Sequence, residues 1–446
     1  MAITYPKVVL TLSDSSTLTW EDTDIIEASV VEEMHPISAT LPISELTIKI
    51  YDPLEKFSIF DENEILAERQ AIMLYENIDG TEYFLGKYYL DEWESVADKE
   101  LQLSAVDFIG VLDTTPFDGR FYSELTSFET VLGVIIGGLE IDYEISTPLQ
   151  SETVRGWIPP GTAREALQQL CFAAGAMVTT SRSEGLVFRE SYVPYADKWH
   201  ELDIEVNSKF MVQPVKKRAA VTGIELISHN FIQSDEQETI FEDTLSPGTY
   251  KIVFDRPYFN VQVTGAGYVP VFWATHLDEV MVTHDDEWIE VGGEFEFGPN
   301  WVILTVQSEG QVTITGNLWI DNQRAFTFQE AGVGSSTRKN ELKIKEATLV
   351  SNENASRTLA RVRDYYRQNY EHQFTLVPQE GPKYGQEVYD EAVYGWSTVN
   401  VKLGQMASIE TVHGVKLRAV IEKADVNLAG GYLVKMNAIG VEMESE

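Results

Sequence analysis

Histidine and acidic side chains are common ligands of protein-bound metals, and their spacing decides whether they can converge on one ion. The chain has seven histidines, and no two of them have the i, i+4 spacing of a helical metal pair. His276 and His284, with Asp285 and Asp286, could approach one another across strands, although a solvated loop is the simpler interpretation. We therefore predict no metal site.

Nucleophiles and phosphate-binding loops are equally scarce. The single cysteine, Cys171, lies on an apolar stripe with helical spacing, which favours a buried structural thiol, because a reactive thiol needs an exposed, electropositive setting. Residues 332–336 (GVGSS) lack the lysine of a phosphate loop and the spacing of a nucleophile elbow, and indicate a flexible connector. The 71 acidic residues would give carboxylate pairs in any fold. We predict no catalytic residue, no cofactor and no enzymatic activity.

Two groups of side chains could instead bind a macromolecule. The first is a set of tryptophans in the middle of the chain: Trp273, Trp288, Trp301 and Trp319. Exposed aromatic rings on a β-sandwich can stack on sugars or anchor a protein partner, whereas buried rings fill a core. Core packing is the favoured interpretation of these tryptophans, and surface binding is the alternative.

The second group is a set of arginines on one predicted helix: Arg357, Arg361, Arg363 and Arg367. They form two pairs with i, i+4 spacing, at which like charges repel slightly. A solvated helix face is the simpler interpretation. The functional interpretation is an interface with an acidic surface, within the chain or on a neighbouring copy, because the guanidinium fork binds carboxylates bidentately.

The length and composition of the chain limit the number of domains and the class of protein in which these residues are placed. At roughly 150 residues per domain, 446 residues correspond to about three domains. The chain carries a net charge of −38 and is 43% apolar, which indicates a folded protein that repels nucleic-acid phosphates and anionic lipids. One cysteine excludes an internal disulfide, which fits a reducing cytoplasm. We expect no signal peptide and no membrane-spanning segment.

The N-terminal part, residues 1–115, is predicted to be strands. Leu46, Ile48 and Ile50 alternate with polar residues, which is typical of a strand with one buried face. Residues 71–75 and 83–90 flank a glycine-containing turn and indicate a hairpin. Many short strands with turns between them favour a small barrel or sandwich.

Residues 116–198 are predicted to form a small α/β domain. Thr126-x-x-Glu129 and Thr162-x-x-Glu165 are capping-box signatures, and each precedes an apolar helical run. Gly175 is a plausible helix stop. Residues 177–180 and 186–188 then indicate a hairpin.

The rest of the chain is predicted to be a second strand-rich domain, residues 199–234 plus 336–446, interrupted by an all-β insertion at 235–335. Asn354 can cap the Arg-rich helix at 354–370. Strands on either side of His413-Gly414 are predicted to form a hairpin, and Gly430-Gly431 separates the second of them from a further strand at 432–441. A weak internal echo links 90–105 with 421–436, and each stretch is followed by Ile-Gly; it is compatible with two related barrels or with chance.

The whole pattern resembles the baseplate or tail hub proteins of tailed bacteriophages and related contractile injection systems. The resemblance covers most of the chain and includes no invariant catalytic motif. It is carried by residues 40–52 (TLPISELTIKIYD), 85–93 (LGKYYLDEW), 105–113 (AVDFIGVLD), 163–170 (AREALQQL), 173–176 (AAGA), the Arg-rich helix, 420–422 (VIE) and 430–432 (GGY).

The resemblance implies a mainly β fold with a small α/β part: two tube-like β-barrels, a small α/β domain and an inserted β-sandwich. It implies a homotrimer whose six barrels form a ring between the six-fold tail tube and the three-fold central spike. Its implied partners are further copies, the tail tube or distal tail protein and the spike protein, with tape-measure and baseplate wedge proteins as further candidates. Assembly would occur in the bacterial cytoplasm, followed by incorporation into the virion or phage-tail-like particle.

In such a ring the acidity would have a use, since carboxylates lining the bore would repel passing DNA. No specific nucleic-acid binding and no direct membrane insertion are expected. The alternative is a carbohydrate-binding or receptor-binding β protein of the same kind of particle. A secreted glycoside hydrolase is disfavoured by the missing signal peptide and the lack of a nucleophile or metal motif.

Overall fold

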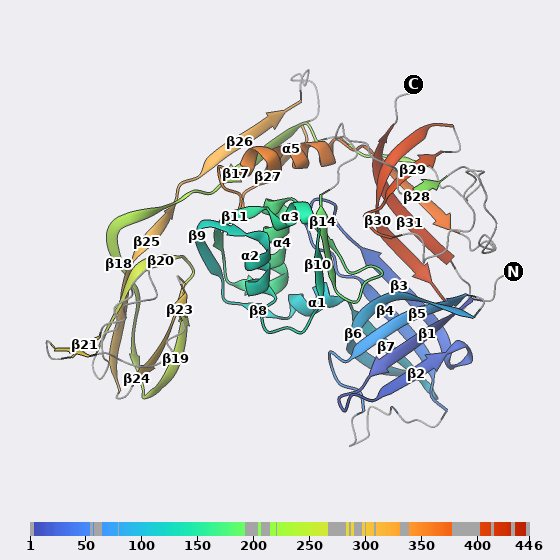
Figure 1. The fold of residues 1–446 in the computed structure, drawn as a ribbon, viewed down its shortest axis with the longest axis horizontal. Coiled ribbons are helices and arrows are strands. Elements are labelled where there is room, and N and C mark those ends of the chain that lie inside the picture. The colour runs from blue at the N-terminus through green and yellow to red at the C-terminus, as the bar shows by residue number, and fades with distance from the viewer. Residues whose placement is uncertain are drawn as a thin grey trace.

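The computed structural model is mainly β with a small α/β part, which confirms the predicted fold class (Figure 1). It describes residues 4–53, 57, 65–78, 80–191, 204–206, 215–219, 221–265, 282–284, 287–289, 297–298, 300–306, 309–330, 339–376, 402–411, 414–429 and 433–442. In the described part, no helix is long and apolar enough to cross a membrane.

Thirteen strands from both ends of the chain form one continuous sheet in the order β16-β28-β31-β30-β3-β4-β7-β6-β5-β1-β2, with β29 and β15 attached beside β30. Its N-terminal strands are β1 (Thr4–Thr11), β2 (Thr17–Glu21), β3 (Ile25–Glu33), β4 (Glu45–Tyr51), β5 (Ala71–Ile78), β6 (Thr81–Ala97) and β7 (Glu100–Val106). The others are β15 (Ile204–Val206), β16 (Lys216–Lys217), β28 (Tyr370–Leu376), β29 (Met406–Glu410), β30 (Lys416–Asn427) and β31 (Leu433–Glu442). A 3₁₀ turn, η1 (Asp22–Asp24), links β2 to β3.

Because apolar and polar residues alternate along its strands, one face of this sheet covers the core. This is as predicted for β4, where Leu46, Ile48 and Ile50 are all buried. The predicted hairpins β5–β6 and β29–β30 are confirmed, and β30 also pairs antiparallel with β31. Both ends of the chain share one hydrophobic core. Among the described strands β2 and β16 terminate the sheet, and closure into barrels stays a prediction.

The α/β part follows, and its core lies beside the large sheet. Thr162 caps α4 in the predicted capping box, and Gly175 ends that helix at a φ of 79°, a left-handed conformation that glycine adopts without strain. α2 is capped by Ser127 and not by Thr126, since the Ser127 hydroxyl accepts from the Thr130 N–H. The elements are α1 (Phe108–Asp113), β8 (Pro116–Phe117), β9 (Arg120–Ser127), α2 (Phe128–Ile135), β10 (Tyr143–Ile145), α3 (Thr147–Gln150), β11 (Thr153–Ile158), β12 (Gly161–Thr162), α4 (Ala163–Ala174), β13 (Ala176–Thr179) and β14 (Leu186–Glu190). The predicted hairpin β13–β14 is confirmed.

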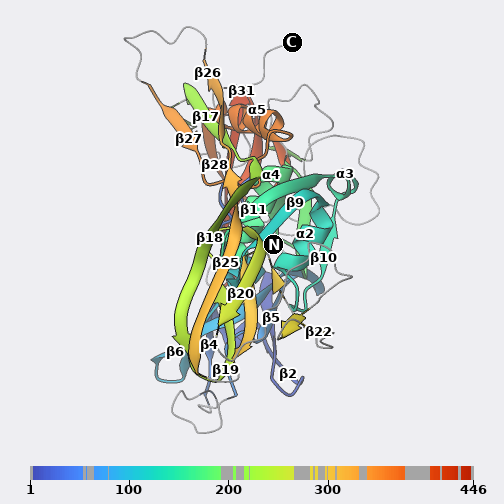
Figure 2. The same ribbon diagram turned by 90° about the vertical axis from the view of Figure 1, so that its left-hand side faces the viewer.

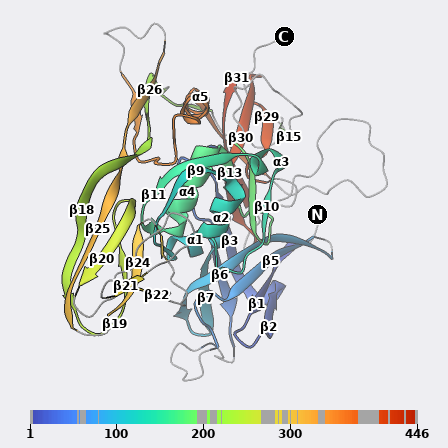
Figure 3. The same ribbon diagram turned by 60° about the vertical axis from the view of Figure 1, so that its left-hand side comes forward.

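A long ribbon leads away from this α/β part to a distal β domain (Figures 2 and 3). β17 (Gly223–Ser228) pairs with β26 (Arg324–Gln329) and β27 (Glu341–Ile344), and the ribbon continues as β18 (Phe231–Leu245) against β25 (Gly310–Asp321). Two sheets, β18-β25-β20 and β19-β24-β23, surround a separate core. Their other strands are β19 (Gly248–Val253), β20 (Tyr258–Gly265), β23 (Phe297–Gly298) and β24 (Trp301–Val306), and β21 (Val282–His284) pairs with β22 (Glu287–Ile289).

The Arg-rich helix α5 spans Ala355–Tyr366 and ends before the predicted residue 370. Asn354 occupies the N-cap position, but its side chain accepts from the backbone N–H of Ser351 (2.9 Å) and donates to the carbonyl of Leu349 (3.1 Å), so it orders the preceding turn. Val362 is fully buried in the α/β core. α5 therefore packs with β17, β26 and α4, and its Tyr365 also reaches Glu422 of β30.

Candidate functional site

The junction between β3 and β30 joins the N-terminal and C-terminal strands into one sheet (Figure 1). Residues 29–33 of β3 run antiparallel to residues 423–427 of β30. Glu33 lies opposite Lys423, and their side chains form an ion pair. The ladder continues one step further, where the Met34 N–H donates to the carbonyl of Glu422 at 2.9 Å. This is an edge-to-edge contact of the kind by which sheets recruit further strands.

The two parts joined at this junction are copies of one pattern. β6 has a bulge between Leu90 and Glu92 where it pairs with β7, and β30 has a bulge between Ile421 and Lys423 where it pairs with β31. Leu90 lies opposite Ala105 as Ile421 lies opposite Ala438. The weak sequence echo therefore reflects a real structural correspondence.

The register corrects the alignment of the echo. The sequence placed Ala105 against Met436, whereas the bulges place it against Ala438, two residues later. The repeated Ile-Gly pair has no structural meaning, because Ile109 and Gly110 lie in α1 while Ile439 and Gly440 lie in β31. Short alternating strands resemble one another at every shift of two residues, so the sequence alone could not choose the register.

A matching turn precedes β5 and β29. The Gln70 carbonyl accepts from the Leu90 N–H (2.9 Å), and the Gln405 carbonyl accepts from the Ile421 N–H (3.1 Å). Each glutamine side chain also accepts from the backbone N–H three residues earlier. Each is preceded by a residue with left-handed φ, 64° at Arg69 and 79° at Gly404. Five strands thus correspond in order and direction: β3, β4, β7, β6 and β5 match β16, β28, β31, β30 and β29. The sixth strands differ, because β1 runs antiparallel to β5 whereas β15 runs parallel to β29.

Buried charges secure the surroundings of this junction. The Arg182 guanidinium donates to Glu32 of β3 at 2.5 Å and to the Leu85 carbonyl at 3.1 Å, with side-chain exposures of only 5% and 2% for the ion pair. Arg182 comes from the loop between β13 and β14, so this contact fixes the α/β part to the N-terminal strands. Removing one partner of such a buried pair is strongly destabilising.

A second buried group lies where α5 meets β30. The Tyr365 hydroxyl donates to Glu422 at 3.3 Å, and the His35 ring lies 4.7 Å from the Tyr365 ring. Burial raises the pKa of Glu422 to about 8, and the Tyr365 hydroxyl and Arg218 offset only part of that shift. Burial, assisted by the charge of Arg218, lowers the pKa of His35 to about 4.

The four predicted interface arginines all have partners inside the chain. Arg357 binds Glu152 bidentately at 2.9 and 3.0 Å. Arg363 lies 2.7 Å from Asp364, and Arg367 lies 3.2 Å from Glu330. Their role toward a neighbouring copy stays a prediction.

Arg361 is the buried member of the set and closes the C-terminus of α4. Its guanidinium donates to the carbonyls of Phe172 (3.0 Å) and Ala173 (3.3 Å) and to the Thr358 hydroxyl (3.0 Å). These are among the carbonyls that a helix end leaves without intrahelical partners, and the negative end of the helix dipole favours a cation there. Burial lowers the pKa of Arg361 to about 10.

The predicted surface tryptophans fall in different places. Trp319 packs against Phe121 (4.8 Å between ring centroids) and Phe259 (5.3 Å), where the ribbon meets the α/β part. Trp301 is partly exposed in the distal domain, with the Lys251 ammonium 5.4 Å from its ring. Trp273 and the side chain of Trp288 lie outside the described residues. Surface binding by this set stays a prediction.

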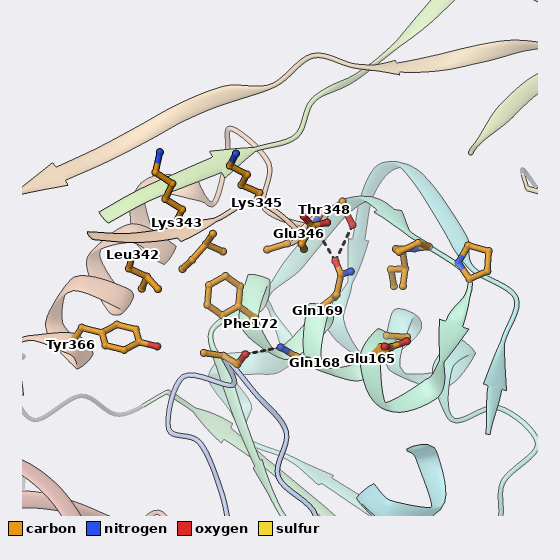
Figure 4. Close-up of a pocket in the computed structure, with 17 residues that line it drawn as sticks. Glu165, Gln168, Gln169, Phe172, Leu342, Lys343, Lys345, Glu346, Thr348 and Tyr366 are labelled. Carbon is orange, nitrogen blue, oxygen red and sulfur yellow. Dashed lines mark hydrogen bonds between the residues drawn. The ribbon is translucent and has the colours of Figure 1, made fainter. Parts of the chain in front are cut away.

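A cleft of about 600 Å³ lies between α4 and β27 (Figure 4). Lys343 and Lys345 stand on one wall, and Gln168, Gln169 and Glu165 on the other. The polar side chains on the α4 wall already make hydrogen bonds within the chain. Glu165 belongs to the capping box, Gln168 donates to the Ala39 carbonyl (2.6 Å), and Gln169 accepts from the Thr348 N–H (3.0 Å). The cleft therefore resembles a packing gap between two parts of the chain more than a built ligand site.

Residues with potential for metal or nucleophilic chemistry are placed as follows. Cys171 is buried as predicted, and burial raises the pKa of its thiol. His284 lies in β21, while His276, Asp285 and Asp286 lie outside the described residues. The buried His229 bridges Asp321 (2.7 Å) and the Lys345 carbonyl (2.9 Å). In the described ranges, no group of three or more His, Cys, Asp or Glu is arranged to hold a metal.

Comparison with solved structures confirms the resemblance to phage tail proteins at the level of the fold. A 43 kDa tail protein of prophage MuSo2 from Shewanella oneidensis matches with a TM-score of 0.50 and 11% identity, over 97% of this chain and 98% of that one. The tail protein from Neisseria meningitidis MC58 matches with a TM-score of 0.51 and 10% identity, over 97% and 96%. No protein-family model and no curated protein sequence matches the chain.

Proposed function

We propose that this chain is a structural hub protein of a phage tail or phage-tail-like baseplate, in which three copies form a ring between the six-fold tail tube and the three-fold central spike. The observation that carries the proposal is the internal repeat, two units with five matching strands each, joined edge to edge by β3 and β30. Three chains with two such units each present six similar units around the axis, which reconciles three-fold with six-fold symmetry.

The shared fold supports this assignment, because two solved tail proteins match over nearly their whole length. The expected partners are further copies, the tube or distal tail protein and the spike protein, with tape-measure and wedge proteins as candidates. Assembly in the bacterial cytoplasm precedes incorporation into the particle. The chain acts as a scaffold, and we assign it no reaction.

The charge of −38 per chain supports a negatively charged channel through the ring. DNA passing such a bore meets repulsion and not adhesion, because duplex binding depends on neutralisation of phosphates by Lys and Arg. The exposed face of β6 carries Glu92 and Glu94, whereas the matching face of β30 carries Asp425 together with Lys423 and Lys435.

The assembly state tests the proposal. Sedimentation of the purified chain, alone and with its tube and spike proteins, should give a species of three times the 50.3 kDa chain mass, or an assembly with three copies per spike. A single copy per particle, or absence of the chain from purified particles, would overturn the hub assignment.

The alternative role, receptor or carbohydrate binding in the same kind of particle, is favoured by one observation. The distal domain has its own core and sits at the end of the ribbon β18–β25, with Trp301 partly exposed. Glycan-array binding that is lost in a Trp301→Ala variant, with folding retained, would favour this role. Trp319→Ala serves as the comparison, because Trp319 packs against the α/β part.

A further inference from the structure

The internal repeat assigns a counterpart to each strand of the β3–β30 junction. β16 takes the place of β3, because it pairs with β28 as β3 pairs with β4, and Glu371 and Glu45 occupy the same position in these central strands. β6 takes the place of β30, as the shared bulge shows. The chain makes one such junction within itself, and its counterpart would need β16 and β6.

Both counterpart edges are open in the described part of the chain. β16 ends the strand order of the large sheet. β5 covers β6 only as far as Tyr89, and residues 92–97 of β6 pair with β7 on one side alone. An exposed strand edge of this length is a template for pairing with another chain unless it is protected.

We propose that neighbouring copies in the ring join by antiparallel pairing of β16 in one copy with residues 92–96 of β6 in the next. This inference rests on the proposed function, because it needs neighbouring copies in a closed ring. Three contacts between copies would alternate with the three junctions inside the chains. Each contact is head-to-tail, because it uses a different edge of each copy. Such contacts form a closed ring when the rotation from one copy to the next adds up to a full turn.

The repeat also fixes which residues meet on the β16 side. Lys216 stands in the position of Val31, because each pairs with the corresponding glutamate of its neighbouring strand. Arg218 follows two residues later and therefore stands in the position of Glu33. The backbone supports this, since the Arg218 N–H continues the ladder to the Asn369 carbonyl at 2.7 Å.

On the β6 side, Glu92 follows its bulge as Lys423 follows the bulge of β30. Glu94 and Asp425 come two residues later on the same exposed face. The similarity extends to the surface, where equivalent positions of the two hairpins line two matching hollows: Glu92, Glu94, Gln102 and Ser104 in one, Lys423, Asp425, Lys435 and Asn437 in the other.

Together these correspondences place Arg218 opposite Glu92 and Lys216 opposite Glu94, with Lys217 opposite Trp93. Two base–acid pairs and one cation–aromatic pair thus face each other across the contact between copies. Cross-strand pairs of opposite charge stabilise a sheet, and a lysine ammonium is attracted to an aromatic face.

The charges are reversed relative to the junction inside the chain. Within the chain the acid, Glu33, comes from β3 and the base, Lys423, from β30. Between copies the base, Arg218, comes from β16 and the acid, Glu92, from β6. The acidic edge of β6 therefore repels the acidic strand β3 and attracts the basic strand β16. In this way β6 and β30, which are equivalent strands of the two repeats, select different partners. Specificity of this kind uses repulsion against the wrong partner as well as attraction to the right one.

The basic strand is accessible for this contact. The Lys216 side chain is 73% exposed and pairs with the Glu371 carboxylate at 3.3 Å, a surface ion pair of small energy. The Lys217 ammonium lies 5.7 Å from the Tyr370 ring centroid. Glu94, at the other edge, accepts from Gln102 at 3.0 Å and is exposed.

A disulfide test checks the register directly. The only natural cysteine, Cys171, is buried, so a Lys216→Cys, Glu94→Cys double variant introduces the only accessible thiols. Directly opposed strand residues lie within disulfide range. Mild oxidation should convert the assembled double variant into covalent trimers on a non-reducing gel. A Lys216→Cys, Asp98→Cys variant displaces one thiol along the chain and should give no such product.

Charge reversal gives the second test. Glu92→Lys with Glu94→Lys should weaken association of copies by about fivefold per reversed pair, because an exposed ion pair is lost at each position. Adding Lys216→Glu and Arg218→Glu in the same chain should restore it. The matched control, Glu124→Lys with Glu144→Lys, carries the same change of charge on exposed residues away from both edges and should assemble as the wild type does.

The outcomes separate this inference from the proposed function. A wild-type trimer that ignores the reversals and forms no Lys216→Cys, Glu94→Cys disulfide would overturn the β16–β6 contact and leave the hub standing. A wild-type chain that forms no trimer, alone or in the particle, would overturn the hub and the contact with it. Circular dichroism of each variant confirms that lost association is not lost folding.

Discussion

Some charged residues stabilise the contacts between parts of the chain, and their residue type alone does not indicate this role. Arg361 looks, in sequence, like its three neighbouring arginines, yet it is buried against the C-terminus of α4, whereas Arg357 is 57% exposed on the same helix. Glu422 looks like one carboxylate among many, yet it lies buried at the β30 bulge. Burial, and not residue type, separates structural from peripheral charges here.

Replacing Arg361 with alanine is expected to destabilise the fold by about 2–4 kcal/mol, because it leaves buried helix carbonyls without donors. Arg357→Ala removes an exposed bidentate pair and is expected to cost at most about 1 kcal/mol. Urea unfolding of the two variants makes the comparison. Equal losses would show that α5 is held by its surface pairs and not by Arg361.

Glu422 should make stability depend on pH. Its folded pKa of about 8 lies above the ordinary glutamate pKa of 4.5, so the folded state favours the protonated form. The contribution is complete below pH 4.5 and is lost as pH rises toward 8. Relative to the wild type, Glu422→Gln should therefore gain stability over this range, by about 1.4 kcal/mol per pH unit.

Unfolding measured at both ends of that range provides the check on Glu422. Glu124→Gln isolates the effect of removing an exposed carboxylate. A stability difference between wild type and Glu422→Gln that does not change with pH would contradict the assigned burial of charge.

At the scale of elements, local signals were the ones that the sequence could supply. The capping box at Thr162, the stop at Gly175 and the hairpins β5–β6 and β13–β14 follow from spacing within a few residues, and the structure confirms them. The junction of β3 with β30 joins residues about 390 positions apart, and no local pattern marks it. The same holds for Arg182, whose partner Glu32 lies 150 residues away.

The predicted site shows the same limit. The arginines at 357–367 stood out as a helical set, but their partners, such as Glu152 and the end of α4, are set by tertiary packing. Lys216, Lys217 and Arg218 were visible only as a short basic run, with no sign that they mirror β3. The missing signal was the register of the internal echo, which becomes unique only once the bulges fix it.

The β3–β30 junction should respond to charge as an element. Lys423→Glu places an acid opposite Glu33 and should destabilise the chain by about 0.5–1 kcal/mol beyond the loss of the pair. Glu33→Lys combined with Lys423→Glu should recover most of that loss. A double-mutant cycle by urea unfolding gives the coupling energy, and zero coupling would show that the ion pair is incidental to the junction.

At the scale of the whole molecule, the chain is built around an internal repeat. Its two strand-rich units share one core and one sheet, Arg182 fixes the α/β part to the N-terminal unit, and the distal domain extends on its ribbon (Figures 1 and 3). A monomer with this architecture leaves β16 and β6 with open edges in its described part. In the proposed ring, strands of neighbouring copies would pair with both of these open edges.

A density map of the assembled particle tests the central claim most directly. The account predicts three copies around the axis, six similar strand units in the ring, β16 of each copy beside β6 of the next, and acidic side chains on the bore. A single copy at the particle tip, or a ring whose bore is neutral or basic and whose copies touch through other surfaces, would contradict it.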